Sequence, residues 1–482
     1  MQKKFITNLA FLLLLNLVIK PFWLLGIDRT VQNTVGAEAY GHYYALFNFT
    51  FLFNILLDLG ITNFNNRNIA QNRHLLDKHL AGIILLRVLL AVGYVIVSLI
   101  VAAFLGYESG QYELLGILIL NQILISFILY LRSNISALHL FKTDSIISVL
   151  DRAIMIVVCG MMLWGSLPGF KFTIQYFVWA QTGAYIVTVL FCLLVISGRA
   201  KIKKLNWSTP FFLMILRQAY PYAILILLMT FYNRIDSVML ERLLTDGSKQ
   251  AGIYAQAFRL LDASNMIAYL FAGLLLPMFA HMLKHKEDIS ALLRLAYSLL
   301  AVPAITLGII ALFYAHEIMN MLYVEHVADS SIVFSVLMCC FFAISTTYVY
   351  GTLLTANGNL KQLNGMAALG MVLNLSMNFY LIPKYQATGA AISSLITQSV
   401  TAFVQVVLCY KLFHLTPDKK IILRFFTFIS CGLLIAWLFK QSTFSWLVDV
   451  IGTIALCAFM AVLLKLINVR EIIFTLRKEG SI

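Results

Sequence analysis

The sequence predicts an all-α polytopic membrane protein with about fourteen transmembrane helices. Of its 482 residues, 61% are hydrophobic and only 12% are charged, whereas a soluble domain is about 45–50% apolar and about 25% charged. The apolar residues form runs of helical length, and a run of about 20 such residues crosses a bilayer. These runs are too long and continuous for the alternating strands of a membrane barrel. The composition therefore excludes a soluble enzyme, a nucleic-acid-binding domain and a disordered chain.

Fourteen apolar runs give the expected order of helices. They cover residues 5–27, 41–64, 82–105, 113–138, 145–167, 173–197, 211–236, 250–280, 291–314, 330–355, 363–382, 388–410, 421–439 and 446–467. The first run lacks a small-residue cleavage site, so we interpret it as a retained helix and not as a signal peptide. An even number of helices leaves both chain ends on one side.

The basic residues predict which side that is. The loops and ends on the side of the termini hold nineteen lysines and arginines, and the opposite loops hold six. Because positive charge gathers on the cytoplasmic side, both termini are predicted to be cytoplasmic. Most of the formal net charge of +14 thus sets orientation and gives no reason to expect nucleic-acid binding.

An internal repeat divides the chain into two halves. Residues 211 positions apart match in four pairs: Gly41/Gly252, Tyr43/Tyr254, Phe47/Phe258 and Asn54/Asn265. The triplet Leu85-Leu86-Arg87 recurs as Leu292-Leu293-Arg294. Six helices per repeat predict two six-helix lobes of the same orientation, related by a pseudo-two-fold axis along the membrane normal, an arrangement known among transporters. The expected domains are residues 1–205, residues 206–416, and a 417–482 segment with two further helices.

The sequence shows no signal for catalysis, a cofactor or a metal. The seven cysteines lie in apolar runs without metal-site or disulfide spacing. No GxxxxGK[ST] run that could cradle a nucleotide phosphate occurs. A membrane-embedded glycosyltransferase or ligase would need outer catalytic acids, and the densest outer acids, Glu317, Glu325 and Asp329, lie in a short segment without a partner motif. We therefore expect no enzyme.

Ionisable residues inside a membrane are costly and usually face a bundle interior or a water-filled cavity. Lys20 lies about 22 Å along the first helix and shares a face with Asn16, four residues earlier. Next to it, Pro21 can kink the helix and free carbonyl groups. The alternative is that Lys20 extends outward to the membrane surface.

The eighth predicted helix places Gln256, Arg259, Asp262 and Asn265 at intervals of three. Arg259 is expected near mid-membrane, where an arginine fork suits a phosphate or carboxylate ligand. A local ion pair with Asp262 is the structural alternative.

The remaining intramembrane polar residues lie on four other predicted helices. Thr50, Asn54 and Asp58 form a stripe at intervals of four on the second helix, either lining a cavity or bonding to other helices. The seventh carries Arg217, Arg234 and Asp236, while Arg132 and Arg152 lie near the cytoplasmic ends of their helices. Asp151 could pair with Arg132. Six cations against four acids favour an anionic substrate.

Four segments carry a resemblance to a known family. They are 56–61 (LLDLGI), 65–70 (NNRNIA), 232–236 (YNRID) and 251–260 (AGIYAQAFRL). Their order and spacing, with the fourteen apolar runs, resemble the polysaccharide transport flippases for O-antigen and capsule repeat units, of the multidrug/oligosaccharidyl-lipid/polysaccharide exporter superfamily.

The resemblance implies two lobes around a central cavity that opens alternately to each side. The implied cargo is an undecaprenyl-diphosphate-linked oligosaccharide, moved from the cytoplasmic to the periplasmic leaflet of a bacterial inner membrane, with a polysaccharide polymerase as a candidate partner. The diphosphate is expected at Lys20 and Arg259, with Arg234 and Arg152. Expected contacts to sugars and other polar cavity residues are Asn16, Tyr43, Asn54, Tyr254, Gln256 and Asn265. Candidate ion-coupling groups are Asp58, Asp236 and Asp262.

Two other transport functions fit the same fold. A multidrug and toxin extrusion-type drug or cation antiporter predicts an acid-dominated cavity, which the excess of cations opposes. A flippase for the cell-wall peptidoglycan precursor is the second alternative.

Overall fold

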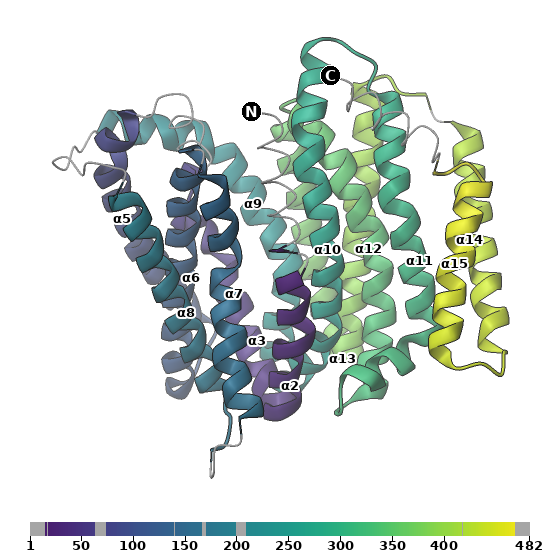
Figure 1. The fold of residues 1–482 in the computed structure, drawn as a ribbon, viewed down its shortest axis with the longest axis horizontal. Helices are drawn as coiled ribbons and strands as arrows, with labels where there is room; N and C mark the ends of the chain where they lie inside the picture. The colour runs from purple at the N-terminus through teal and green to yellow at the C-terminus, as the bar shows by residue number, and fades with distance from the viewer. Residues whose placement is uncertain are drawn as a thin grey trace. The chain divides into compact units, whose positions relative to one another are not determined.

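The computed structural model describes residues 15–16, 18–62, 74–138, 140–165, 170–198, 209–416 and 418–467. Within these ranges the regular elements are all helical, with thirteen α-helices and no β-strand (Figure 1). Eleven of the helices are long and apolar enough to cross a membrane. The predicted all-α, polytopic membrane fold is therefore confirmed.

The elements follow one another in this order: η1 (Trp23–Asp28, a π-helical turn), α2 (Arg29–Val35), α3 (Ala37–Leu52), η2 (Asn54–Leu57, a 3-10 turn), α5 (His74–Phe104), α6 (Ser109–Ala137), α7 (Phe141–Trp164), α8 (Ile174–Ser197), α9 (Thr209–Leu243), α10 (Gly247–Lys284), α11 (Ser290–Leu322), α12 (Val327–Ala356), α13 (Leu360–Leu412), α14 (Lys419–Lys440) and α15 (Trp446–Leu463).

The predicted continuous helix over 41–64 is wrong in its second half. Helix α3 ends at Leu52, and a 3-10 turn and a bend with positive φ at Leu59 and Gly60 follow. The Asp58 carboxylate accepts hydrogen bonds from the backbone N–H groups of Gly60 and Thr62, each at 3.1 Å. Such local side-chain bonds compete with the helical pattern, so the predicted polar stripe does not lie on one helical face.

Helix α13 contains two of the predicted spans, 363–382 and 388–410. Its only residue with non-helical backbone angles is Gln386, at φ 51° and ψ −132°. The Ser393 hydroxyl donates to the Asn374 carbonyl at 3.2 Å, although a straight helix would separate residues that far apart by about 28 Å. The chain therefore reverses near Gln386, as the two predicted runs require. Gly389 permits the turn, since a Cβ there would lie 2.2 Å from the Leu381 carbonyl oxygen.

The chain divides into two compact units, Met1–Gly252 and Ile253–Ile482. In the first unit α3 packs on α9, and α6 packs on α8. In the second unit α11 and α12 pack together, as do α12 and α13. The two predicted C-terminal helices, α14 and α15, form a pair against α11 (Figure 1, yellow). Their shared core includes Ile309, Phe428, Ala436 and Cys457.

Two glycines that match in the repeat lie against each other inside the first unit. A Cβ on Gly41 would lie 1.8 Å from the Ser248 carbonyl oxygen, and a Cβ on Gly252 would lie 1.9 Å from the Ala37 carbonyl oxygen. Ala37 and Ser248 are separated by the same 211 positions as the two glycines. The contact is reciprocal, as a local two-fold axis between the starts of α3 and α10 would produce.

We predict that Gly41→Ala or Gly252→Ala lowers stability by about 1–3 kcal/mol, because backbone atoms must move to admit the methyl group. The measurement is thermal unfolding of the purified protein in detergent. Gly93→Ala on α5 is the matched control, because a Cβ there has no neighbour within 4 Å, and alanine favours a helix. Unchanged unfolding of both contact variants would contradict the close approach.

Candidate functional site

The N-terminal segment changes helical geometry directly after Pro21. Residues 18–22 are α-helical, and Trp23–Asp28 form the π-helical turn η1. Proline lacks the N–H that the α pattern uses, and single π-turns recur at functional sites. The Tyr40 hydroxyl donates to the buried Asp28 carboxylate at 2.8 Å and ties the turn to α3.

Lys20 belongs to a group of charges that we call the cation cluster, formed by Lys20, Arg132, Asp144, Asp151 and Arg152. The half-buried Lys20 interacts electrostatically with Arg152, Arg132 and Asp151. The Arg152 Nε lies 3.7 Å from an Asp151 oxygen, and the Arg132 Nε donates to Asp144 at 2.9 Å. The cation cluster as defined here thus contains three cations and two carboxylates.

The cation cluster extends from a helix end into the membrane span. Asp144 lies in the first turn of α7, and Arg132 lies near the end of α6. Arg152 lies about 15 Å along the Lys142–Trp164 span, and its guanidinium stacks over the Trp23 ring at 5.2 Å. The charges thus lie at increasing distances from the helix ends, and Lys20 and Arg152 lie deepest in the span.

The predicted common face of Asn16 and Lys20 meets a matching face of α7. Asn16 Nδ2 donates to the Ser148 hydroxyl at 3.1 Å, and Lys20 interacts with Arg152, one turn further along α7. The structure therefore brings together three predicted site residues, Asn16, Lys20 and Arg152.

The suggested pairing of Arg132 with Asp151 is wrong, because Arg132 binds Asp144 instead. Sequence reasoning did not single out Asp144, Ser148 or Trp23. A signal for two of them was present: Asp144, Ser145, Ser148, Asp151 and Arg152 follow the spacing of one helical face.

Tyr43 lies in the core of the first unit and is 1% exposed. Its hydroxyl accepts a hydrogen bond from Gln181 Nε2 at 3.1 Å, and its ring meets Phe177 edge-on at 5.5 Å. Phe177 also stacks on Trp23 at 5.9 Å. Tyr43 therefore supports the wall on which the π-helical turn rests.

Asp58 is engaged by a buried arginine that sequence reasoning had noted only as part of the repeat. Arg87 of α5 forms an ion pair with Asp58, donates to the Ser126 carbonyl at 3.1 Å and lies over the Tyr130 ring at 4.6 Å. Only 1% of the Arg87 side chain is exposed, against 26% for Asp58. The pair joins the break after α3 to α5 and α6.

Three other predicted residues lie elsewhere in the first unit. The Arg234 guanidinium lies over the Phe51 ring at 5.4 Å. Asp236 is buried, and Asn54 is half-buried in the 3-10 turn.

The four polar residues predicted at intervals of three lie on α10, in the part of that helix that belongs to the second unit. Gln256 Nε2 donates to the Glu325 carbonyl at 3.2 Å, while its side-chain oxygen accepts no hydrogen bond within the described chain. The buried side-chain oxygen of Asn265 likewise has no donor among the described residues. Arg259 and Asp262 are half-buried between them, and Tyr254 stacks on Phe258 at 5.4 Å.

This arrangement defines a class of protein: a polytopic helical membrane protein with a charged cluster inside its spans. Several solved structures share the fold. A structure of "Lipid II flippase MurJ, inward closed conformation" matches with a TM-score of 0.73 and 13% identity, covering 93% of this chain and 98% of that one. An inward-facing multidrug resistance MATE family transporter of the MOP superfamily matches with a TM-score of 0.64 and 15% identity, over 84% and 96%.

A MOP superfamily transporter from Pyrococcus furiosus, whose description reports a reverse polarity of its binding pocket, has a TM-score of 0.55 and 15% identity. It covers 84% of this chain and 94% of its own. A search of curated protein sequences gives no significant match.

The family described as polysaccharide biosynthesis protein matches residues 5–283. Because this match covers more than half of the chain, the protein belongs to that family. The family and the transporter fold confirm the predicted resemblance and the prediction that the chain is not an enzyme.

We predict that Asp58→Asn destabilises the protein more than Arg87→Met. Removing one partner of a buried pair costs about 3–5 kcal/mol. Asp58→Asn removes the ionic partner of a guanidinium that is only 1% exposed, whereas Arg87→Met leaves a carboxylate that is 26% exposed. The measurement is thermal unfolding of each single variant and of the double variant, which should recover part of the loss. An Asp58→Asn protein of normal stability would contradict this structural role.

Proposed function

We propose that this protein is a flippase for undecaprenyl-diphosphate-linked oligosaccharide repeat units of a surface polysaccharide. The observation that carries the proposal is the cation cluster, in which three cations share two carboxylates along a membrane span. Such a balance favours an anionic ligand. A diphosphate is a doubly anionic group whose oxygens suit the guanidinium fork and the ammonium point charge together.

The graded depth of the cluster suggests how the headgroup enters. Arg132 near the helix end would attract the diphosphate first, and Arg152 and Lys20 would then replace its hydration deeper in the span. Trp23 offers an aromatic face beside the same guanidinium, a surface suited to packing against a sugar ring. The isoprenoid tail stays in the surrounding lipid throughout.

The row on α10 is the proposed second contact. Arg259 is the proposed diphosphate contact of the second unit, and Arg234 on α9 is a further one of the first unit. The two buried oxygens of Gln256 and Asn265 that lack donors within the described residues would accept hydrogen bonds from sugar hydroxyl groups, because buried acceptors are costly when unpaired. Asn16 and Asn54 are further proposed sugar contacts, while Tyr43 and Tyr254 are buried and would shape the walls.

We propose alternating access without nucleotide hydrolysis. The energy would come from the membrane potential, an ion gradient or consumption of the product on the far side. Asp236 and Asp262 are the proposed coupling groups, with Asp58 ranking lower because it already neutralises Arg87. The proposed location is a bacterial inner membrane with both termini in the cytoplasm, and a polysaccharide polymerase is the proposed consumer of the flipped unit.

A flippase for the peptidoglycan precursor is the second candidate, favoured by the structural match to a protein named as a lipid II flippase. A diphosphate-linked cargo would suit the cation cluster equally well. Rescue of cells depleted of their peptidoglycan flippase would favour this candidate over the repeat-unit flippase. A drug antiporter would instead change the drug susceptibility of an expressing strain.

We predict that Lys20→Ala, Arg152→Ala and Arg259→Ala each reduce transport at least about tenfold, because each removes a charge-assisted hydrogen bond to the diphosphate. The measurements are surface-polysaccharide export in cells lacking the wild-type protein, and flipping of a defined undecaprenyl-diphosphate oligosaccharide in proteoliposomes. Lys20→Arg and Arg152→Lys should retain part of the activity, since they keep the charge.

Lys171→Ala is the matched control, because Lys171 is an exposed cation in the segment before α8. Equal loss of activity in the control would point to a general effect of charge. Normal export by both Lys20→Ala and Arg259→Ala would overturn the assignment of the site.

A further inference from the structure

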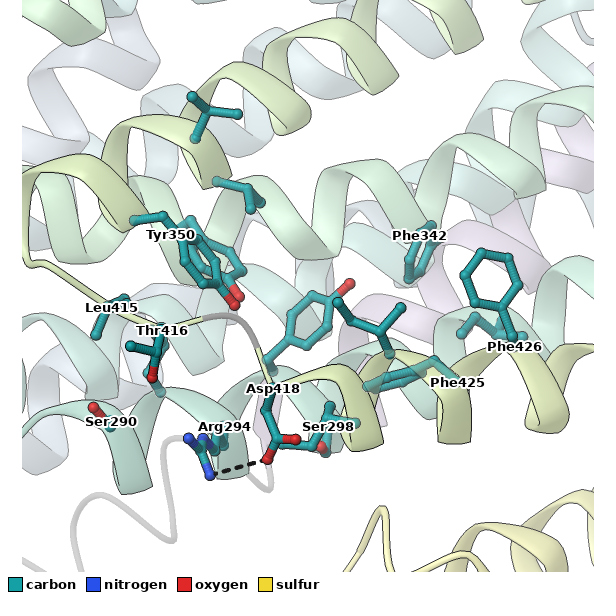
Figure 2. Close-up of a pocket in the computed structure, with 18 of the residues that line it drawn as sticks. Ser290, Arg294, Ser298, Phe342, Tyr350, Leu415, Thr416, Asp418, Phe425 and Phe426 are labelled. Carbon is teal, nitrogen blue, oxygen red and sulfur yellow. Dashed lines mark ion pairs between the residues drawn. The ribbon is translucent and has the colours of Figure 1, made fainter.

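The second unit contains a crevice of about 790 Å³ between α11, α12, the end of α13 and the start of α14 (Figure 2). This volume falls in the range of about 300–1,000 Å³ that is typical of small-molecule sites. None of the residues that line it belongs to the cation cluster, and the transport mechanism proposed above does not use it.

One part of the crevice is lined by apolar and aromatic side chains. Tyr297 meets Tyr350 at 5.5 Å and Phe425 at 5.5 Å. The walls continue through Ile305, Phe342 and Ile429. At the lip, Phe426 is 66% exposed, so the aromatic wall continues onto the outer surface of α14. A hydrocarbon chain could therefore enter sideways.

The other part of the crevice is polar and lies where α13 ends and α14 begins. The lining includes two cations, Arg294 and Lys411, and one acid, Asp418. Arg294 lies 3.5 Å from the Asp418 carboxylate (Figure 2). The Asp418 carboxylate also accepts the backbone N–H of Lys420 at 2.9 Å, as the cap of α14. Arg294 has five N–H donors, and its side chain is 52% exposed.

The nearby acids Glu287 and Asp288 lie in an adjoining hollow with Lys286. The backbone N–H of Ser290 donates to Asp288 at 2.9 Å, which holds the pKa of that carboxyl below its ordinary value. Asp288 is therefore bonded to the backbone where α11 begins. The residues that line the crevice itself include two cations, Arg294 and Lys411, and one acid, Asp418.

Arg294 differs in exposure and in its contacts from the arginine that matches it in the first half of the predicted repeat. Arg294 corresponds to Arg87 in the repeated triplet. Arg87 is 1% exposed and bonds to Asp58 and Ser126, whereas Arg294 stands half-exposed at the mouth of the crevice. The arginine at this position of the predicted repeat is thus packed in the first unit and half-exposed in the second.

We propose that the crevice binds an anionic phospholipid of the bilayer, with its phosphate on Arg294 and Lys411 and an acyl chain along the aromatic wall. The polar end lies at the helix ends, where lipid headgroups lie, and basic pockets between transmembrane helices are suited to such headgroups. Charge selects an anionic over a zwitterionic lipid. The bound lipid would join α14 to α11, α12 and α13. This proposal does not depend on the proposed transport function.

Titration of the purified full-length protein with lipids, followed by native mass spectrometry, tests the proposal. Phosphatidylglycerol should bind about tenfold more tightly than phosphatidylcholine of the same chains, as expected for a charge-assisted contact. The double variant Arg294→Gln/Lys411→Gln should lose this preference. Val406→Phe, which fills the crevice without changing its charge, should weaken phosphatidylglycerol binding about as much.

The matched control is Lys284→Gln/Lys361→Gln, which removes two exposed cations outside the crevice and should bind like the wild type. Each variant is first checked for normal thermal unfolding. Equal affinity for the two lipids, or equal loss in the control, would overturn the proposal. Displacement by inorganic phosphate would indicate a free anion as the ligand, and displacement by equimolar undecaprenyl phosphate would indicate the transported lipid; either result would also overturn it.

Discussion

The absence of water in the bilayer is the constraint on which the rest of this structure depends. Backbone groups must find partners inside the protein, and the described chain is accordingly built from helices alone. Where the backbone leaves helical geometry, polar side chains form hydrogen bonds with backbone groups. Asp58 accepts the N–H groups of Gly60 and Thr62 after α3 ends, and Ser393 bonds to Asn374 across the reversal in α13. At the end of α3, a polar side chain thus supplies acceptors for backbone N–H groups that the helical pattern no longer pairs.

The same constraint governs the charges, and the protein meets it in three ways. Arg87 and Asp58 form a buried pair with additional hydrogen bonds to α6. The cation cluster contains three cations and two carboxylates, a composition that suits the anion site that we propose there. Arg294 remains beside water and lipid at a helix end. Arg87 and Arg294 occupy matching positions of the predicted repeat, yet the first is packed in an ion pair and the second lines a crevice.

Much of the fold follows from the sequence, because apolar length alone identifies a membrane span. The two runs on either side of residue 385 were correctly predicted as separate spans, because the polar residues between them interrupt the hydrophobic pattern, and the chain reverses there at Gln386. The end of α3 could not be predicted, because it depends on Asp58 bonding to its own backbone. Depth along a helix predicted Lys20 as a charge inside the membrane, whereas Arg152 was expected near the cytoplasmic end of its helix. Hydropathy does not say which helices are neighbours. The pairing of Arg132 with Asp144 and of Arg87 with Asp58 therefore required the three-dimensional structure, and the predicted motif at 65–70 lies outside the described residues.

The reciprocal contact of Gly41 and Gly252 also limits how this sequence can evolve. A side chain on either glycine would strike a main-chain carbonyl on the other helix, and no substitution on the opposite helix can remove a carbonyl. In most packed pairs of side chains, a substitution in one can be compensated by a substitution in the other. At these two positions no second substitution can relieve the clash. After a duplication, the two copies could diverge at nearly every other site while this pair stayed fixed. Gly41 and Gly252 should therefore be the positions at which the similarity between the two halves of the sequence lasts longest.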